Sequence, residues 1–190
     1  MLAVLDHKDS FTHNLVHMLK EIDEIKVIEH TEAGNIDISR LDALVFSPGP
    51  GGPNDYPESI SLYKRAKGNL PILGVCLGFQ MILYSEGARI VRQPKVLHGV
   101  QTPIIFDNKS LSYRDLKPPL DVGRYHSLQV APNSVPDHIS ITAWDQSKKV
   151  PLSVECPSLK IYGFQYHPDS FLSDHGQKIL TNCLSGRMGS

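Results

Sequence analysis

The chain reads ILGVCLG from Ile72 to Gly78, where a short apolar run passes directly into a helical pattern. The run Ile72–Val75 has no polar alternation, which is typical of a strand buried on both faces of a parallel sheet. Leu77–Glu86 has the length and apolar content of a helix, and a glycine follows it. This stretch predicts a buried strand, a sharp turn at Cys76 and a helix.

Towards the N-terminus, short apolar runs alternate with helical patterns in the same way. Strands are predicted at Leu2–Leu5, Lys26–Ile28 and Ala43–Phe46. Helices are predicted after a cap at Asp9 or Ser10 and over about Pro57–Ala66. This alternation predicts an α/β fold whose parallel sheet is covered by helices. The wholly apolar Ala43–Phe46 is expected in the centre of the sheet, and Lys26–Ile28 nearer an edge.

The second half of the chain is richer in strands and turn residues. Strands are predicted at Arg89–Val91, Thr102–Ile105, Ser127–Val130, Ile139–Trp144, Leu152–Glu155 and Ile161–Gln165. A last helix is predicted over Asp169–Leu184, with Ile179, Leu180 and Cys183 on its apolar side. We expect one domain over residues 1–186 and a frayed tail at 187–190.

Composition limits the classes of function that the chain can have. Apolar residues are 41% and charged residues 21% of 190 residues, as in ordinary globular domains. A formal net charge of −1 gives no electrostatic case for binding nucleic acid or an anionic membrane. The three widely spaced cysteines and nine scattered histidines form neither a disulfide framework nor a zinc cluster. No apolar run approaches the ~20 residues of a membrane span, so a soluble cytoplasmic protein is expected.

Cys76 has the sequence context of a nucleophile elbow. A tight strand-to-helix turn presents the side chain of its central residue, and Gly74 and Gly78 let the chain pass without a Cβ clash. The N-terminus of the helix favours the thiolate form, and the N–H of Leu77 points to where an oxyanion would form. A buried structural cysteine at a strand end is the alternative interpretation.

A second source of N–H groups is predicted in Ser47-Pro48-Gly49-Pro50-Gly51-Gly52-Pro53, in which six of seven residues are Gly or Pro. The segment leaves the carboxyl end of a predicted strand, where open parallel sheets bind their ligands. Glycines let backbone N–H groups approach a substrate, and prolines fix the path of the loop. An ordinary surface turn needs fewer such residues, and a phosphate-binding P-loop would end in Lys-Ser/Thr.

His167 is the first candidate for the base that a thiol nucleophile needs. It follows the predicted strand Ile161–Gln165, and Asp169 lies two residues further on, where its carboxylate can hold the tautomer of the ring. His126 is the rival candidate. His98 and His175, each before a glycine, are expected in loop or capping roles. The spacing alone does not show that His167 meets Cys76.

Together these segments resemble a class I glutamine amidotransferase domain, with the likeness running nearly end to end. Within that class the chain is most similar to the glutaminase subunit of anthranilate synthase and aminodeoxychorismate synthase. The motifs that carry the resemblance are Asp9-Ser10-Phe11-Thr12-His13-Asn14-Leu15, Ser47-Pro48-Gly49-Pro50-Gly51, Gly74-Val75-Cys76-Leu77-Gly78-Phe79-Gln80, His98-Gly99, Gly123-Arg124-Tyr125-His126-Ser127-Leu128, Gly163-Phe164-Gln165-Tyr166-His167-Pro168-Asp169-Ser170 and His175-Gly176. The resemblance implies a three-layer, flavodoxin-like fold: an open, mostly parallel sheet flanked by helices, with a smaller antiparallel sheet.

The resemblance also implies a reaction. Cys76 would attack the side-chain amide of glutamine, His167 would act as base and then protonate the departing ammonia, and Asp169 would complete the triad. Water would then hydrolyse the γ-glutamyl thioester. Oxyanion-hole N–H groups would come from Gly51 and Leu77, and the glutamine would be held by Gly49, Pro50, Gly51, Gln80, Ser127 and Leu128. No metal or cofactor is implied, and the partner would be a chorismate-binding synthase subunit that takes up the ammonia.

Two positions depart from the pattern of the family. The family usually has His-Pro-Glu-Ser where this chain has an aspartate, Asp169, whose side chain is shorter by one C–C bond, about 1.5 Å. We expect activity to be retained, although weakened unless the backbone compensates. Phe79 stands where the chorismate-related subunits often have histidine, and we expect it to pack or contact a partner.

Three alternatives remain open at this point. The glutaminase could serve a different synthase, although the Asp9–Leu15 segment argues against this. The domain could be catalytically weak or dead and regulate a synthase, with Asp169 as the mark of lost activity. Finally, the chain could be an independent cysteine hydrolase such as a peptidase.

Overall fold

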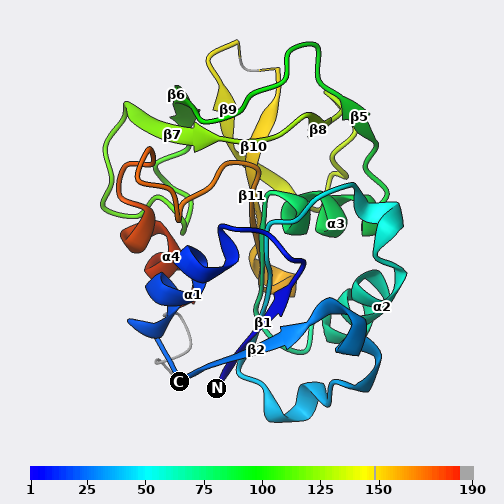
Figure 1. Ribbon diagram of the computed structural model, residues 1–190. Helices are drawn as coiled ribbons and strands as arrows, with labels where there is room; N and C mark the ends of the chain where they lie inside the picture. Colours follow the sequence, from blue (N-terminus) through cyan, green and yellow to red (C-terminus); the bar gives the residue numbers. More distant parts are fainter. Residues whose placement is uncertain (148, 185–190) are drawn as a thin grey trace.

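A computed structural model of the chain describes residues 1–147 and 149–184 (Figure 1). The strands are β1 (Leu2–Asp6), β2 (Ile25–Glu29), β3 (Ala43–Phe46), β4 (Ile72–Val75), β5 (Ile90–Arg92), β6 (Val100–Phe106), β7 (Leu120–Arg124), β8 (Leu128–Val130), β9 (Ser140–Asp145), β10 (Pro151–Cys156) and β11 (Ile161–Phe164). The α-helices are α1 (Thr12–Lys20), α2 (Pro57–Ala66), α3 (Leu77–Ser85) and α4 (Gly176–Leu184). Short 3-10 helices are η1 (His30–Asn35), η2 (Ile38–Arg40), η3 (Pro53–Asp55) and η4 (Pro157–Leu159). The predicted tail, 187–190, lies outside the described residues.

Within the described residues, one nine-stranded sheet has the order β2-β1-β3-β4-β11-β10-β9-β6-β7. The first five strands in that order pair in parallel, and the remaining pairings are antiparallel. Strands β5 and β8 form a separate two-stranded antiparallel sheet. The central position of β3 and the edge position of β2 agree with the predictions made from their apolar content.

Helices cover both faces of the parallel strands and make three layers (Figure 1). On one face, α1 and α4 pack on side chains such as Val4, Val45 and Phe164. On the other face, α2 and α3 pack on side chains such as Leu5 and Phe46. Alternate residues of each strand supply the two cores, as the strand period of two requires. The predicted α/β class, with an open sheet flanked by helices and a small antiparallel sheet, is confirmed.

Two elements of the second half differ from the prediction. Strand β7 was not expected, because its short LDVGR sequence contains an aspartate and a glycine and follows a pair of prolines. Pairing with β6 nevertheless makes it a strand. Helix α4 begins at Gly176 rather than at Asp169. The preceding residues form turns, with hydrogen bonds from Ser170 N–H to His167 O and from Ser173 N–H to Ser170 O.

The cap predicted for the first helix is wrong in a way that matters for the site. Helix α1 begins at Thr12 without a side-chain cap at its N-terminus. Asp9 instead accepts a hydrogen bond from the N–H of Phe11 at 2.8 Å, which shapes the turn between β1 and the helix. The turn places Asp9 and Phe11 at the carboxyl end of the parallel strands.

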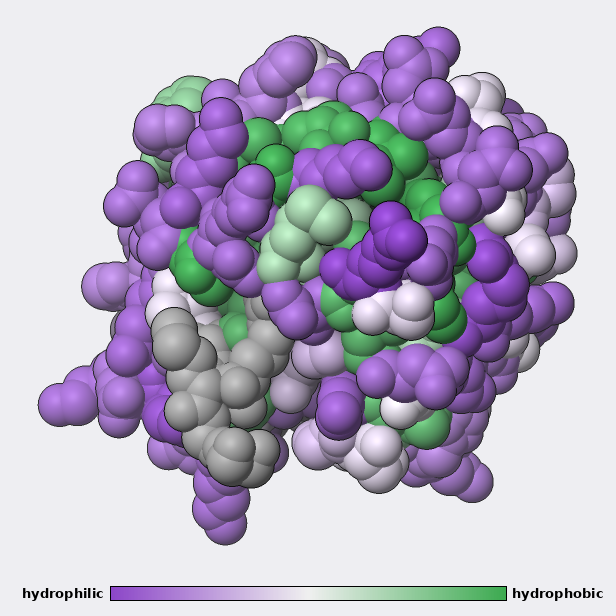
Figure 2. Space-filling view, turned by 90° about the horizontal axis from the view of Figure 1, so that it is seen from below, coloured by the Kyte–Doolittle hydropathy of each residue, from purple (hydrophilic) through white to green (hydrophobic). Residues whose placement is uncertain are grey.

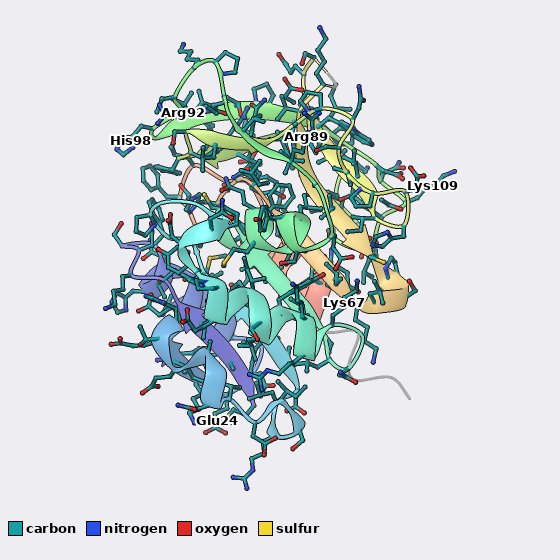
Figure 3. The ribbon with its side chains drawn as sticks, turned by 90° about the vertical axis from the view of Figure 1, so that its right-hand side faces the viewer. Glu24, Lys67, Arg89, Arg92, His98 and Lys109 are labelled. Atoms are coloured by element: carbon teal, nitrogen blue, oxygen red, sulfur yellow. The ribbon has the colours of Figure 1, made fainter. Side chains whose placement is uncertain are left out.

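The surface is mixed in character. At the amino ends of the parallel strands, polar residues predominate and hydrophobic residues show between them (Figure 2). Arg89, Arg92 and His98 lie at the end with the antiparallel strands, whereas Glu24 lies at the opposite end (Figure 3). Among the described helices, none combines the length and apolar content needed to cross a bilayer.

Candidate active site

Cys76 occupies a strained turn between β4 and α3. Its backbone has φ 52° and ψ −99°, a region that non-glycine residues rarely adopt and that costs roughly 1–3 kcal/mol. The residue is 7% exposed. The strand and helix on either side hold this conformation, and the first turn of α3 presents backbone N–H groups that lack intrahelical partners. The geometry matches the elbow expected from the sequence.

The two glycines of the elbow are required by close packing. A Cβ at Gly78 would lie 2.2 Å from the carbonyl oxygen of Phe46, and a Cβ at Gly74 would lie 2.5 Å from the carbonyl carbon of Gly78. Real Cβ atoms do not approach backbone so closely, so any side chain here would move β3, β4 or α3. The elbow is therefore fixed by backbone contact.

The glycine- and proline-rich loop after β3 is held by a buried histidine. His7 Nδ1 lies 3.1 Å from Ser47 Oγ, and its Nε2 lies 3.1 Å from Ser59 Oγ. Because the Ser47 hydroxyl donates to Pro48 O, it accepts a hydrogen bond from Nδ1–H of His7. Burial, with His30 nearby, lowers the pKa of His7 to about 3. The start of the loop is thus anchored to β1 and α2.

The middle of the same loop faces the pocket. Gly51 has φ 74°, and a Cβ there would lie 2.4 Å from a carboxylate oxygen of Asp55. That carboxylate accepts a hydrogen bond from Gly52 N–H at 2.8 Å. Tyr56 OH donates to Pro50 O at 3.0 Å. The positive φ at position 51 favours glycine, and Gly51 lines the cavity.

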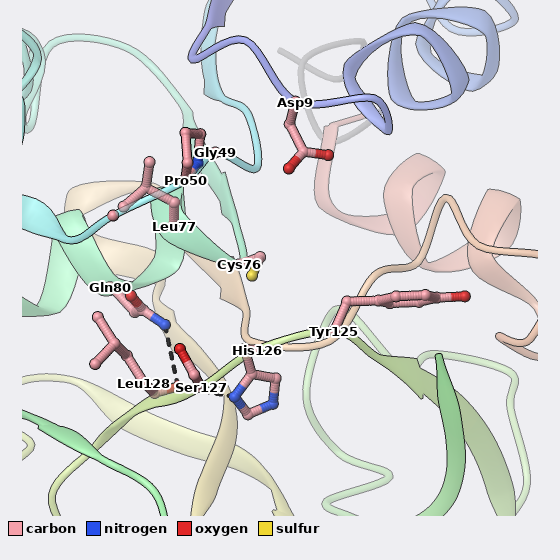
Figure 4. A pocket seen from close by; sticks show the side chains of 11 residues that line it. Asp9, Gly49, Pro50, Cys76, Leu77, Gln80, Tyr125, His126, Ser127 and Leu128 are labelled. Carbon is pink, nitrogen blue, oxygen red and sulfur yellow. Dashed lines mark hydrogen bonds between the residues drawn. The ribbon is translucent and has the colours of Figure 1, made fainter. Parts of the chain in front are cut away.

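A cavity of about 230 Å³ opens beside Cys76 (Figure 4). Its lining contains the predicted residues Gly49, Pro50, Gly51, Cys76, Leu77, Gln80, Ser127 and Leu128, together with Asp9, Tyr125 and His126. These residues come from four separate parts of the chain, which meet at the carboxyl ends of the parallel strands. This is the place where open α/β sheets bind ligands. His167 and Asp169 are absent from this lining.

Gln80 and His126 organise the strand that forms one wall. Gln80 Nε2 donates to Leu128 O at 3.3 Å and to Gln165 Oε1 at 3.1 Å. Both hydrogens of Nε2 are used, so Oε1 of Gln80 is the atom that can accept a hydrogen bond from a ligand. His126 Nδ1 lies 2.8 Å from Leu128 O, and its Nε2 accepts from Arg124 Nε at 3.1 Å.

His126 does not suit the role of base that the sequence left open for it. Arg124 Nε can only donate, so Nε2 of His126 accepts and Nδ1 carries the proton. Burial and the Arg124 charge lower the pKa of His126 to about 3. The ring is neutral and both nitrogens already have partners. His126 is thus better placed to shape the wall of the cavity than to take a proton from Cys76.

His167 lies beside Cys76 because β11 pairs in parallel with β4. The N–H of Cys76 donates to Phe164 O at 2.7 Å, and His167 N–H donates to Gly123 O at 3.0 Å. The imidazole is 2% exposed, with the rings of Phe11 and Tyr125 at centroid distances of 4.7 and 5.0 Å. Long-range pairing therefore brings together two residues that are far apart in the sequence.

Asp169 lies close to His167 but does not reach hydrogen-bonding geometry. Oδ1 of Asp169 is 3.5 Å from Nδ1 of His167, and both side chains are buried. In the described part of the chain, His167 Nδ1 and both carboxylate oxygens have no hydrogen-bond partner. The two side chains therefore form an ion pair whose atoms are too far apart for a hydrogen bond. A glutamate would reach about 1.5 Å further.

The charge state of His167 follows from its neighbours. Burial on its own lowers the pKa of His167, but the Asp169 carboxylate and the sulfur of Cys76 raise it more, to about 10. The imidazole therefore carries a proton at neutral pH. A cationic imidazole beside a cysteine favours the thiolate and can deliver a proton to a leaving group.

Comparison with known proteins identifies the family. The sequence model of the family described as "Glutamine amidotransferase class-I" matches residues 3–186. The chain belongs to the class I glutamine amidotransferases. The resemblance that the motifs carried is thereby confirmed.

Curated relatives of this amidotransferase cover almost its whole length. It is 39% identical to "Anthranilate synthase component 2" of Pseudomonas aeruginosa PAO1, over 100% of this chain and 97% of that protein. It is 36% identical to "Aminodeoxychorismate synthase component 2" of Escherichia coli K12, over 97% and 99%. It is 37% identical to "Aminodeoxychorismate/anthranilate synthase component 2" of Bacillus subtilis 168, over 97% and 95%.

A solved structure shares the fold of this amidotransferase. A protein from Thermoplasma acidophilum, described as part of a putative GMP synthase, superimposes with a TM-score of 0.84. The alignment covers 97% of this chain and 92% of that chain at 22% identity. At that identity the likeness speaks for the fold alone.

The remaining residues singled out in the sequence, His98, His175 and Phe79, do not line the cavity. The His98 ring lies 6.3 Å from that of Tyr125, and His175 precedes the first residue of α4 with φ 54°. Phe79 is fully buried, and a Cβ at Gly163 would lie 2.9 Å from its ring. Phe79 packs against β11, as expected. In the described residues, no group of three or more His, Cys, Asp or Glu side chains could hold a metal.

The structure also places residues at the site to which the sequence gave no role. Asp9 and Tyr125 line the cavity, and Phe11 packs on His167. Their motifs were noticed, but the direction of each side chain depends on long-range packing. His7 lies in the polar stretch from Asp6 to Ser10 and had no signal, whereas Gln165 had only its polar character between Phe164 and Tyr166.

Proposed function

We propose that this chain is the glutaminase subunit of a synthase that acts on chorismate, with Cys76 as nucleophile. The observation that carries the proposal is the elbow cysteine, placed at the cavity beside a buried, protonated His167. Membership of the class I amidotransferases supplies glutamine as substrate.

In the proposed reaction, the Cys76 thiolate attacks the side-chain carbonyl carbon of glutamine and a C–S bond forms. Negative charge on the carbonyl oxygen is stabilised by the N–H groups of Gly51 and Leu77. The C–N bond then breaks, and His167 gives its proton to the leaving nitrogen, which departs as ammonia. Water, deprotonated by His167, hydrolyses the γ-glutamyl thioester and glutamate leaves.

The proposed recognition of glutamine uses the wall opposite the oxyanion loop. Gln80 Oε1 accepts from the α-ammonium group, and the Ser127–Leu128 backbone meets the α-carboxylate and ammonium groups. Gly49 and Pro50 close the other side. This assignment is supported by the lining of the cavity and by the hydrogen bonds that orient Gln80 and the Leu128 carbonyl.

A synthase partner is the finer part of the proposal. The relatives are named as second components of anthranilate or aminodeoxychorismate synthases. Ammonia released into bulk water would be protonated, so an enclosed path to a second active site preserves its reactivity. Phe171 is 92% exposed and follows the segment from His167 to Ser170, so a large apolar side chain lies in water next to the site. We place the contact with the partner there.

The test is glutamate formation from glutamine by the purified chain, alone and with the chorismate-binding synthase of the same organism. We expect turnover to appear or rise sharply when the partner is added. Complex formation with no turnover in either state would contradict the glutaminase proposal and indicate a regulatory domain. High turnover on γ-glutamyl or peptide substrates that is the same with and without the partner would indicate an independent hydrolase.

A further inference from the structure

Gln165 places a side-chain amide against the nucleophile. The residue follows β11 between Phe164 and Tyr166 and is fully buried. Its backbone N–H donates to Leu152 O at 2.9 Å, which fixes the start of the side chain. Its Nε2 lies 3.8 Å from Sγ of Cys76 and donates to it.

The surrounding hydrogen bonds decide which end of this amide faces the sulfur. A backbone carbonyl can only accept, so the atom of Gln80 next to Leu128 O is its nitrogen. The second hydrogen of that nitrogen points to Gln165, whose nearest atom, 3.1 Å away, must then be its oxygen. The NH₂ group of Gln165 is left facing Cys76. A flipped amide would set two NH₂ groups against each other.

A glutamine at this position is costly unless its polar atoms have partners. Burying an amide without hydrogen bonds costs roughly 1–3 kcal/mol in proteins, and the neighbours of Gln165 in sequence are apolar or aromatic. The two side-chain partners of Gln165 are Gln80 and Cys76. A donor aimed at sulfur gains most when the sulfur is a thiolate, because hydrogen bonds to charged groups are the stronger ones.

We infer that Gln165 is a further functional residue of the site: its amide stabilises the Cys76 thiolate and couples it to Gln80. The inference rests on the proposed role of Cys76 as nucleophile. No bond forms or breaks at Gln165. When Sγ is acylated it loses its negative charge, and the hydrogen bond weakens until glutamate leaves.

The coupling to Gln80 gives the amide a second effect. Gln80 is proposed to bind the α-ammonium group of glutamine, and its nitrogen is oriented jointly by Leu128 O and Gln165 Oε1. Loss of the Gln165 amide therefore frees Gln80 as well as the sulfur. We expect both a lower kcat and a higher KM.

The test uses Gln165→Met, which keeps the length of the side chain and removes the amide, and Gln165→Glu, which puts an oxygen where the NH₂ was. Gln177→Leu is the matched control, because that amide donates to Met18 O between α4 and α1, outside the cavity. Alkylation of Cys76 by iodoacetamide is followed against pH by mass spectrometry of its peptide. This separates it from Cys156 and Cys183.

In Gln165→Met we expect alkylation at pH 7 to slow roughly tenfold and its half-maximal pH to rise by about one unit, as loss of a hydrogen bond to a charged group predicts. Gln165→Glu should raise the half-maximal pH of alkylation further, and Gln177→Leu should match the wild type. An unchanged pH dependence in both folded Gln165 variants would overturn the inference. Glutaminase turnover is measured on the same samples. A wild type that alkylates as expected but releases no glutamate would contradict the proposed function and leave the hydrogen bond standing.

Discussion

The two sides of the candidate active site differ in how tightly their residues are packed. On the Cys76 side, backbone contacts at Gly74 and Gly78 leave no room for a Cβ, and a strained φ is held between a strand and a helix. On the His167 side, the imidazole and Asp169 are separated by 3.5 Å, and three buried polar atoms lack hydrogen bonds in the described part of the chain. The proposed nucleophile is positioned by rigid backbone, whereas the proposed base is positioned by charge and aromatic packing.

The largest expected effect comes from breaking the rigid side. In Gly78→Ala the new Cβ meets Phe46 O at 2.2 Å, so β3 and α3 must separate and the protein should lose about 3 kcal/mol of unfolding free energy. Urea unfolding measures this loss. Gly34→Ala is the control, because nothing lies within 4 Å of its Cβ, and it should change stability by no more than about 0.5 kcal/mol. Equal effects of the two substitutions would refute the rigid-elbow account.

The next prediction concerns the loose side. Asp169→Asn removes the charge that holds the proton on His167 and should slow glutaminase turnover roughly 10- to 100-fold. Asp169→Glu extends the carboxylate by about 1.5 Å, enough to close the gap, and should keep or raise turnover. Steady-state kinetics on both variants gives the answer. If activity collapses in Asp169→Glu, the surroundings have adapted to the shorter acid.

Two histidines, one on each side of the site, have pKa values shifted in opposite directions, so their contributions to stability should change in opposite ways with pH. His7, whose pKa is lowered to about 3 from 6.5, stays neutral on folding, so its contribution to stability is present above pH 6.5 and is lost as pH falls towards 3. His167, raised to about 10, contributes stability that is full below pH 6.5 and is lost as pH rises towards 10. Urea unfolding against pH in His7→Asn and His167→Gln checks this. The first should flatten the acid limb of the curve, and the second the alkaline limb. NMR signals showing both rings titrating near pH 6.5 would contradict the two assignments.

The smallest effect is expected outside the cavity. Phe171→Ser should leave the turnover of the isolated chain unchanged and weaken binding to the synthase by about tenfold, since an aromatic anchor at an interface is often worth more than 1 kcal/mol. Titration calorimetry measures the affinity. Phe11→Leu is the contrasting variant, because its ring packs on His167 and it should lower turnover instead. Unchanged affinity in Phe171→Ser would place the partner elsewhere.

Elements that depend on neighbouring residues could be predicted from the sequence, whereas those that depend on long-range pairing could not. Strand β4 and the turn at Cys76 follow from the ILGVCLG stretch, so the elbow was predicted correctly from neighbouring residues. Strand β7 was missed because its strand character comes from pairing with β6. The predicted start of helix α4 was too early, because the residues after His167 form turns although their propensity allows a helix. A Cβ at Gly176 would lie 1.8 Å from Pro168 O, so the helix starts where only glycine can pass.

The candidate site shows the same division. Cys76 and the loop from Ser47 to Pro53 were found from local composition. The meeting of Cys76 with His167 depends on the parallel pairing of β11 with β4, and only the resemblance to a family supplied it beforehand. The amide of Gln165, which reaches the sulfur from the residue after β11, had no local signal beyond a polar side chain between two aromatic ones.

The central claim is that Cys76 carries the attack on glutamine while the partner uses the ammonia. The most direct test compares product formation by the reconstituted synthase from glutamine and from ammonium salts, with wild-type chain and with Cys76→Ala. The account predicts that Cys76→Ala abolishes glutamine-dependent synthesis, by at least about 10⁴-fold, and leaves ammonium-dependent synthesis unchanged. Synthesis from glutamine that persists in Cys76→Ala would contradict it.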